Sequence, residues 1–250
     1  MLKNVIFWIG LICLNFSCLP DDDGVRVVDD FQETYELFFS YGTNTDRYLR
    51  RHLVDYFQMV VLASEYGADF PLVKKWTKTM KVYMSGSPDP MLEIELKNIV
   101  EELNDLFTDG FQIQIVDDSL ASNFHIYLGD KSTYSKMYPD VAHLLPDNKG
   151  LFTIHLNSDF SIDRGHMFVD IVNYNMDFQK HVLREEITQS LGLTNDIQYY
   201  NNSIFYALPS KVQSYSNMDI EVIRLLYHPR IVPKLGTSSV TAILENILGI

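Results

Sequence analysis

The spacing of apolar residues predicts that helices and strands alternate along most of the chain. Some segments have apolar residues at helical spacing, and shorter ones alternate apolar with polar residues. The expected helices are 45–66, 90–107, 178–191 and 220–227, and the expected strands are 76–84, 111–115, 124–128, 151–156 and 167–172. Residues 130–150 are rich in Tyr, Pro, Asp and Lys and are expected to form a loop. This order predicts an α+β domain built on a mixed five-stranded sheet.

The segment 178–191 has the clearest pattern in the chain. Its apolar residues recur at every fourth position and form one stripe of a helix, namely Leu183, Ile187 and Leu191. Polar side chains recur at the same spacing on the other side, namely His181, Glu185 and Gln189. Gly192 follows directly and is typical of a helix that ends in a left-handed turn. Asn195 and Asp196 come next, so polar residues continue past the end of the helix.

Residues 185–196 read E-E-x-x-Q-x-x-G-x-x-N-D, which resembles the zinc-binding helix of the metzincin metallopeptidases. In the metzincin pattern H-E-x-x-H-x-x-G-x-x-H, two histidines one turn apart face a metal and the Glu activates a metal-bound water. The Gly lets a third histidine approach the same metal. Here the Glu and Gly of the pattern are Glu186 and Gly192, and the resemblance implies that Glu186 is the catalytic base. It places the metal-ligand positions at Glu185, Gln189 and Asn195.

The same stretch is more similar still to an uncharacterised bacterial family, domain of unknown function 2927. Members of that family carry the core E-E-x-T-Q-x-L-G-L-x-N-D, which residues 185–196 match, and Ser203-Ile204-Phe205 follow it here. No established activity accompanies this family, so the resemblance implies no substrate.

Residues 215–219 resemble the Met-turn that lies under the metal in metzincins. Met218 precedes the predicted helix 220–227, and Asp219 is expected to cap that helix. Metzincins that add a tyrosine ligand place it two residues after this Met, where the present chain has Ile220. The resemblance implies a zincin fold with an edge strand at 151–156 above the cleft, an active-site helix, a Met-turn and a C-terminal helix. The residues that would support the site are Gly192, Asp196 and Met218.

The three ligand positions hold Glu, Gln and Asn in place of the metzincin histidines, and this changes the metal chemistry expected at the site. Glu, Gln and Asn offer only oxygen, whereas zinc sites use mainly His nitrogen and Cys sulfur. If a divalent metal binds, a harder cation such as calcium, magnesium or manganese suits these ligands better than zinc. Without zinc, Glu186 has no activated water to deprotonate. A site without metal is equally consistent with the sequence, and the polar residues would then form a buried hydrogen-bond network: Glu185, Gln189, Asn195 and Asp196.

A nearby histidine could supply a nitrogen ligand to a metal at this site. His181 lies one turn before Glu185 on the same helix face, although a helix histidine that is only hydrogen-bonded is the commoner case. Four other histidines are scattered over the predicted strands and the loop, and each is a remote candidate for a ligand: His125, His143, His155 and His166.

The first residues predict export. Lys3 followed by the apolar run 5–16 is typical of a signal peptide, and that run is too short to span a membrane as a stable helix. Ser17-Cys18 resembles a bacterial lipoprotein cleavage site. The resemblance implies removal of residues 1–17, lipid on Cys18 and anchoring in the outer membrane, with the acidic run after Cys18 resembling a tag for export to the cell surface. A plain secretory signal is the alternative.

We divide the remaining chain into a tether at 18–43, a helical extension at 44–72 and a metzincin-like domain at 73–250. The 250 residues, 46% of them hydrophobic, are enough for one full core. A formal charge of −13 makes nucleic acid an unsuitable partner, because phosphate binding requires a basic surface. Cys13 lies inside the predicted signal, so no disulfide is expected after cleavage.

Three functions remain open. The favoured one is a surface lipoprotein that binds a peptide or a glycan in a metallopeptidase-like cleft without hydrolysing it. The first alternative is a metal-dependent peptidase that uses Glu186 with atypical ligands. The second is a structural component of the envelope, whose cleft would be filled by its own side chains.

Overall fold

The computed structural model describes residues 44–63 and 71–250. The signal peptide at 1–17, the lipidation site at Cys18 and the tether at 18–43 lie outside these ranges and stay predictions. Within the described ranges, no helix has both the length and the apolar character needed to cross a membrane.

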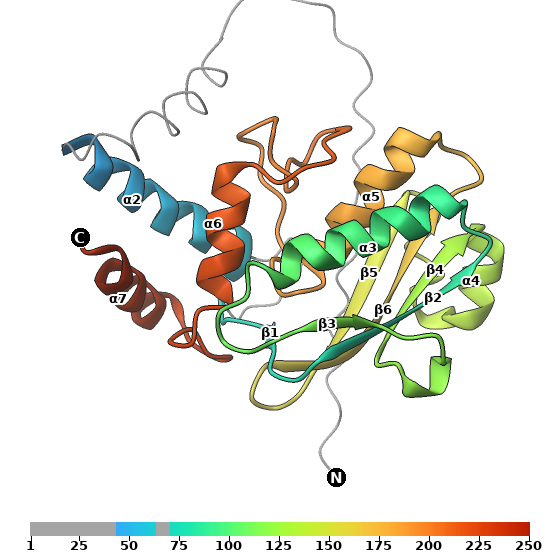
Figure 1. Ribbon diagram of the computed structural model, residues 1–250, viewed down its shortest axis with the longest axis horizontal. Coiled ribbons are helices and arrows are strands. Elements are labelled where there is room, and N and C mark those ends of the chain that lie inside the picture. Colours follow the sequence, from blue (N-terminus) through green and yellow to red (C-terminus); the bar gives the residue numbers. More distant parts are fainter. Residues whose placement is uncertain (1–43, 64–70) are drawn as a thin grey trace, which may run out of the picture.

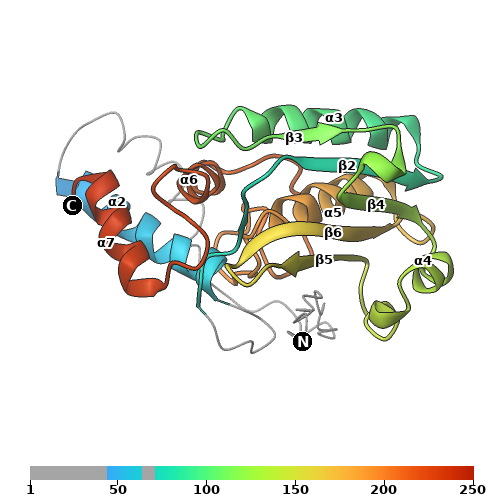
Figure 2. The same cartoon turned by 90° about the horizontal axis from the view of Figure 1, so that it is seen from below.

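The described residues form one mixed sheet of six strands (Figure 1). The strands are β1 (Lys75–Trp76), β2 (Met80–Gly86), β3 (Ile113–Ile115), β4 (Phe124–Gly129), β5 (Gly150–Leu156) and β6 (Ser161–Asp170). All paired strands are parallel except β5 and β6. The short β1 and then β4 pair with successive parts of β6, while β5 runs antiparallel along it. Figure 2 shows five of the strands in the order β3, β2, β4, β6, β5. A mixed sheet is therefore confirmed, with β1 added to the five predicted strands.

Two helices cover one face of this sheet. α3 (Pro90–Asn104) and α5 (Met176–Gln189) lie side by side, and α5 also contacts β5 and β6 (Figure 1). Alternate strand positions point toward these helices and are buried, for example Phe152, Ile154 and Met167. They share a core with Leu183 and Ile187 from the predicted apolar stripe of α5. The two-residue period of the strands and the helical period of α5 thus meet in one hydrophobic core.

The other face of the sheet is covered by elements that the sequence analysis missed. α4 (Lys131–Met137) and the 3-10 turn η3 (Pro139–Val141) lie in the region predicted to be a loop. Asp130 starts α4 by accepting a hydrogen bond from the backbone N–H of Thr133 at 2.9 Å. Tyr134 is the buried residue of α4, so the helix has no apolar stripe that could reveal it.

Two predicted strands have different boundaries in the structure. The expected strand 76–84 is interrupted by a bend at 77–79, which separates β1 from β2. β6 begins at Ser161 rather than at residue 167. Asp163 and Arg164 gave that part of β6 the polar character of a turn, yet it pairs with β5.

Helix starts agree with the predicted caps in one case and not in the other. Asp89 caps α3 and accepts from the backbone N–H of Met91 at 2.8 Å, as predicted. α6 (Asn217–Leu226) begins earlier than predicted, because Ser216 is its cap and Asp219 lies in its first turn. Ser216 Oγ accepts from Asp219 N at 3.2 Å and an Asp219 oxygen accepts from Ser216 N at 2.9 Å, which is a capping box. The expected cap at Asp219 and the expected tight turn at Met218 were therefore wrong.

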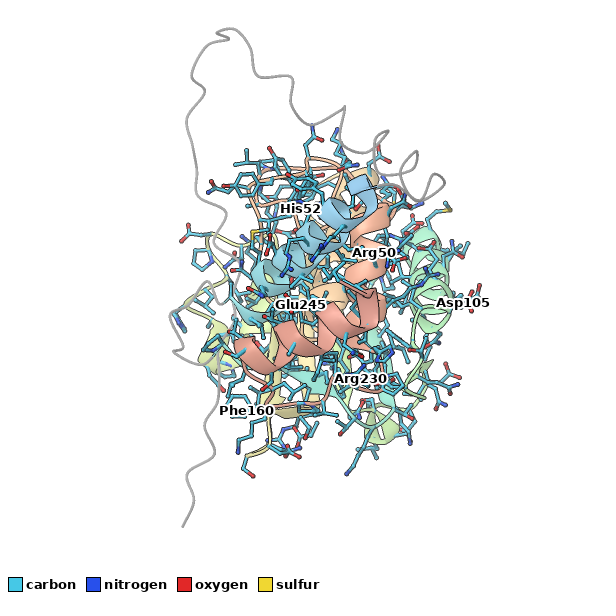
Figure 3. The ribbon with its side chains drawn as sticks, turned by 90° about the vertical axis from the view of Figure 1, so that its left-hand side faces the viewer. Arg50, His52, Asp105, Phe160, Arg230 and Glu245 are labelled. Atoms are coloured by element: carbon cyan, nitrogen blue, oxygen red, sulfur yellow. The ribbon has the colours of Figure 1, made fainter. Side chains whose placement is uncertain are left out.

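A helix that was not predicted follows α6. α7 (Thr237–Leu248) packs on α2 (Asn44–Phe57), which continues into the π-helix η1 (Gln58–Leu62). Arg50 donates to the carbonyl of Leu248 and Arg51 pairs with Glu245, so α2 and α7 are joined by polar contacts as well as by packing (Figure 3). The apolar residues of α2 and η1 belong to the same core cluster as the sheet and α5.

Side chains on the α4 face of the sheet form what we call the histidine–tyrosine cluster: Ser85, His125, Tyr134, Tyr138 and His166. His125 contacts Ser85 Oγ through Nε2 and the Tyr138 hydroxyl through Nδ1, each at 2.6 Å. His166 Nδ1 lies 2.5 Å from the Tyr134 hydroxyl, and its ring stacks on Tyr138 with centroids 3.6 Å apart. Two of the histidines that looked scattered in the sequence are thus cross-strand neighbours, on the sheet face opposite α5.

Acidification is expected to destabilise the fold through this cluster. Burial lowers the pKa of His166 from 6.5 to about 3, with smaller contributions from His155 and His125. Between these two values the unfolded chain binds more protons than the folded chain, so the free energy of unfolding falls as pH decreases through this window. His166 alone contributes up to about 1.4 kcal/mol per pH unit. Urea unfolding at several pH values should show a shallower slope for His166→Asn than for the wild type. Equal slopes would contradict this assignment.

Candidate functional site

The helix that carries the sequence motif is enclosed by the rest of the molecule. Asn175 caps α5 by accepting from the backbone N–H of Phe178 at 3.1 Å. Every residue from His181 to Gln189 is buried, including the charged residues Arg184, Glu185 and Glu186. The polar side of α5 therefore does not face an open cleft.

Acidic side chains of α3 compensate the buried charge of Arg184. Arg184 Nη2 lies 2.9 Å from Glu95 Oε1, and Nη1 is bonded to Glu102. The guanidinium also lies 4.8 Å from the centroid of the Tyr215 ring, and Lys180 approaches Glu95 at 3.8 Å. A buried guanidinium requires such partners, so this cluster fixes α5 against α3.

His181 and Glu185 face each other along α5, one turn apart. His181 Nδ1 donates to the carbonyl of Val212 at 2.7 Å, which identifies Nδ1 as the protonated nitrogen, because a carbonyl can only accept. Nε2 lies 3.6 Å from Glu185 Oε2. Burial lowers the pKa of His181, although the bond to Val212 opposes this effect. His181 is therefore neutral at neutral pH, and its contact with Glu185 is not an ion pair under those conditions.

A small cavity lies over the two glutamates. It is lined by His181, Glu185 and Glu186 on α5, by Gly150 at the start of β5, and by the loop 206–210. Its volume is about 30 Å³, which is room for about two water molecules. Glu186 itself is 0% exposed. The carboxylate at the position corresponding to a catalytic base is therefore shielded from bulk solvent.

Gly150 is the reason that β5 can lie so close to Glu186. A Cβ atom at position 150 would lie 2.4 Å from Glu186 Oε1 and 2.3 Å from Val182 Cγ1. Real side chains do not make such contacts, so any larger residue here would require the side chains of Glu186 and Val182 to shift. The sequence analysis did not identify Gly150, because a glycine at a strand start has no distinctive pattern.

The other candidate ligands lie beyond the cavity. Gln189 Nε2 donates to Asp196 Oδ1, and Gln189 Oε1 has no hydrogen-bond partner among the described residues. Asn195 Nδ2 donates to the carbonyl of Met59 at 2.8 Å and to that of Asp196 at 3.0 Å. Gln189, Asn195 and Asp196 are thus joined by hydrogen bonds around the turn that follows α5. Glu185 belongs to the separate group that lines the cavity.

These residues do not fit a zinc ion. Glu185, Gln189 and Asn195 offer oxygen donors only, and the Asn195 amide is directed to η1 by its bond to Met59. In the part of the chain that the structure describes, no three side chains of His, Cys, Asp or Glu are grouped so that they could hold a metal ion. His181 donates through Nδ1 to Val212, so Nε2, 3.6 Å from Glu185 Oε2, is the one nitrogen at this site that could bind a metal, and a single nitrogen does not complete a zinc ligand set.

Comparison with known proteins assigns the chain to a family. The family model described as "Protein of unknown function (DUF2927)" matches residues 50–246. The chain belongs to the DUF2927 family. This match confirms the resemblance seen in residues 185–196, and it begins inside α2, within the segment predicted to be an extension.

No curated protein matches this DUF2927 chain. Among solved structures, one match is to myroilysin, a metallopeptidase, at 10% sequence identity and a TM-score of 0.37. The match covers 62% of the present chain and 95% of the myroilysin chain.

Asp219, which was expected only to cap a helix, is bonded to three separate segments of the chain. Asp219 is fully buried, and Tyr56 and Ser203 each donate to its Oδ1 at 2.7 Å. The backbone N–H groups of Ile204 and Ser216 donate to its Oδ2 at 3.0 and 2.9 Å. Burial raises the pKa of Asp219, and these bonds oppose the increase. Asp219 therefore joins α2, the segment after the motif, and α6. Met218 beside it is 2% exposed and belongs to the core.

The turn after α5 depends on Gly192. Its φ is +112°, and a Cβ atom there would lie 2.0 Å from the carbonyl oxygen of Lys74. The carbonyls at the end of α5 are bonded by side chains of other elements: Trp76 Nε1 donates to Ser190 O at 3.0 Å and the Tyr227 hydroxyl to Leu191 O at 2.9 Å. The motif glycine thus brings the end of α5 against β1 and α6.

Gly192→Ala is expected to lower the free energy of unfolding by more than about 3 kcal/mol, because the new methyl group meets backbone atoms that cannot rotate away. Gly110→Ala is the matched control. Gly110 also has a positive φ, +88°, but nothing lies within 4 Å of a Cβ built there, so the cost should be about 1–2 kcal/mol. Urea unfolding of both variants measures the difference. Equal destabilisation would show that the approach of Lys74 contributes nothing.

Proposed function

We propose that this DUF2927 chain is an exported lipoprotein whose metallopeptidase-like domain binds a peptide or a glycan without hydrolysing it. The lipoprotein part of the proposal rests on the N-terminal residues, with Ser17-Cys18 as the cleavage site. The non-hydrolytic part rests on the chemistry around α5.

The observation that carries the proposal is that hydrogen bonds within the chain hold the polar side chains at the motif positions. Gln189 and Asn195 donate their amide protons to protein acceptors, and His181 donates to Val212. Metal-assisted hydrolysis requires a metal with an open position for water, held by ligands that converge on it. Among the described residues no three His, Cys, Asp or Glu side chains converge in this way, and the bonds of Gln189 to Asp196 and of Asn195 to Met59 support a structural role instead.

The sheet topology supports a zincin-like arrangement for the domain. The five strands β3, β2, β4, β6 and β5 follow one another across the sheet, and the single antiparallel strand lies beside α5. This order, together with the E-E-x-x-Q-x-x-G spacing on α5, agrees with the fold that the motif implies. Fold alone does not specify an activity, so function is argued from the site.

The mouth of the cavity has the character of a binding site. Leu208 is 50% exposed and lies in the loop that lines the cavity. Lys149 Nζ lies 5.2 Å from the centroid of the Phe178 ring, and Phe178 also lines the cavity. Apolar and aromatic groups at the mouth of a cavity that holds a few polar side chains are typical of ligand sites. Displacement of the loop 206–210 would be required to admit a peptide or a sugar.

The test uses the full chain, a labelled casein substrate, and ligands selected on the wild type from a random peptide library and a glycan array. We expect no casein turnover above buffer for the wild type or for Glu186→Gln. Selected ligands should bind Glu186→Gln with unchanged affinity, because the carboxylate is not used for chemistry. Leu208→Asp should weaken binding by at least about tenfold, since it places a charge on the apolar mouth.

Leu120→Asp is the matched control, because Leu120 is 93% exposed and does not line the cavity. It should leave binding unchanged. Casein turnover that is lost in Glu186→Gln, with unfolding unaffected, would instead support the peptidase. Failure to select any ligand would favour the structural envelope component.

A further inference from the structure

A second and larger cavity lies away from α5. Its volume is about 350 Å³, and it is lined by residues 75–79, 109–111, 229 and 231–233. We call it the basic groove. β1 contributes to it and α4 lies at the other end of the sheet, as Figure 1 shows. Its size is within the range of sites for small organic ligands, and the proposed function makes no use of it.

The charge of the basic groove is opposite to that of the whole chain. Its lining holds two lysines, Lys75 and Lys78, and one acid, Asp109, whereas the chain carries a formal charge of −13. Four more basic residues flank the lining segments in the sequence, namely Lys74, Lys81, Arg230 and Lys234. Burial lowers the pKa of His228, Arg230 and Lys75 lower it further, and Asp109 opposes this effect. Arg230 is labelled in Figure 3.

The single acid of the groove is already used by the protein. Lys75 Nζ lies 2.6 Å from Asp109 Oδ2 and also donates to the carbonyls of Leu226 at 2.8 Å and Ile231 at 3.0 Å. Asp109 Oδ1 accepts from the backbone N–H of Phe111 at 3.0 Å. Lys75 and Asp109 therefore neutralise each other, and Asp109 does not offset the charge of Lys78.

The remaining walls combine hydroxyl groups with apolar surface. Thr77 and Lys78 are exposed and Thr79 is half-buried, so their polar groups are available to a ligand. Apolar lining comes from both sides of the groove, with Val232 49% exposed and Phe111 7% exposed. A ligand that contacts both the polar and the apolar lining residues must have a charged end and an apolar body.

We propose that the basic groove binds an organic anion, with its phosphate or carboxylate group near Lys78 and the threonine hydroxyls, and its apolar part against Val232 and the adjacent prolines. Such a molecule is either a free metabolite or the headgroup region of an anionic lipid. Both sources present the same chemistry to the groove. The acidic remainder of the protein surface disfavours nucleic acid as the source.

The experiment uses the full chain carrying Trp8→Phe, which leaves Trp76 as its single tryptophan, and Trp76 lines the groove. Phenyl phosphate is titrated by calorimetry and by tryptophan fluorescence, beside inorganic phosphate and phenol. We expect phenyl phosphate to bind at least about tenfold more tightly than either fragment, because only phenyl phosphate satisfies both walls. Vesicles containing phosphatidylglycerol replace the soluble probes in a second arm, and binding in that arm identifies a lipid as the source.

Lys78→Glu should weaken the binding of phenyl phosphate, or of the vesicles, by about five- to tenfold, since it reverses the charge beside the anion. Lys136→Glu makes the same change on exposed α4 and should have no effect. Absence of binding in both arms would overturn the proposal. Equal effects of Lys78→Glu and Lys136→Glu would also overturn it, because they would show a general effect of net charge. Unfolding curves verify that both variants are folded.

Discussion

Burial of a charged helix is the constraint on which this molecule depends. Arg184, Glu185 and Glu186 are consecutive on α5, and all three are buried. Arg184 is compensated by Glu95 and Glu102 from α3, so the two helices that cover the sheet are bound together by charge as well as by apolar packing. Removing one partner of a buried ion pair typically costs about 3–5 kcal/mol, because the other charge is left without compensation. The position of α5 is therefore determined by its ion pairs with α3 and by its packing on β5 and β6.

The same constraint determines what the motif does. In a metallopeptidase the residues at these spacings hold a metal in an open cleft. Here Gln189 is bonded to Asp196, Asn195 is bonded to Met59, and Gly150 brings β5 against Glu186. Gly192 keeps the conformational role that the motif gives it, because its positive φ brings the end of α5 against Lys74. The spacing is thus compatible with a helix that organises the core without binding zinc.

Elements whose formation depends on residues close together in the chain were predictable from the sequence. The apolar stripe on α5 and the Asp89-Pro90 start of α3 each depend on residues within one or two turns, and the structure has both elements where they were expected. α4 was missed because Tyr134 is its buried residue, and the start of β6 was missed because Asp163 and Arg164 resemble a turn. The candidate site was harder to predict. The partners of Asp219, the histidine–tyrosine cluster and the approach of Gly150 to Glu186 all join residues that are far apart in the chain, and local periodicity carries no information about them.

The most direct test of the proposal that α5 organises the core without binding zinc is the zinc content of the full chain, purified without chelator and measured by mass spectrometry. Our account predicts much less than one zinc per chain, with no change in Glu185→Ala or Gln189→Ala. One tightly bound zinc per chain that is lost in both variants would contradict it.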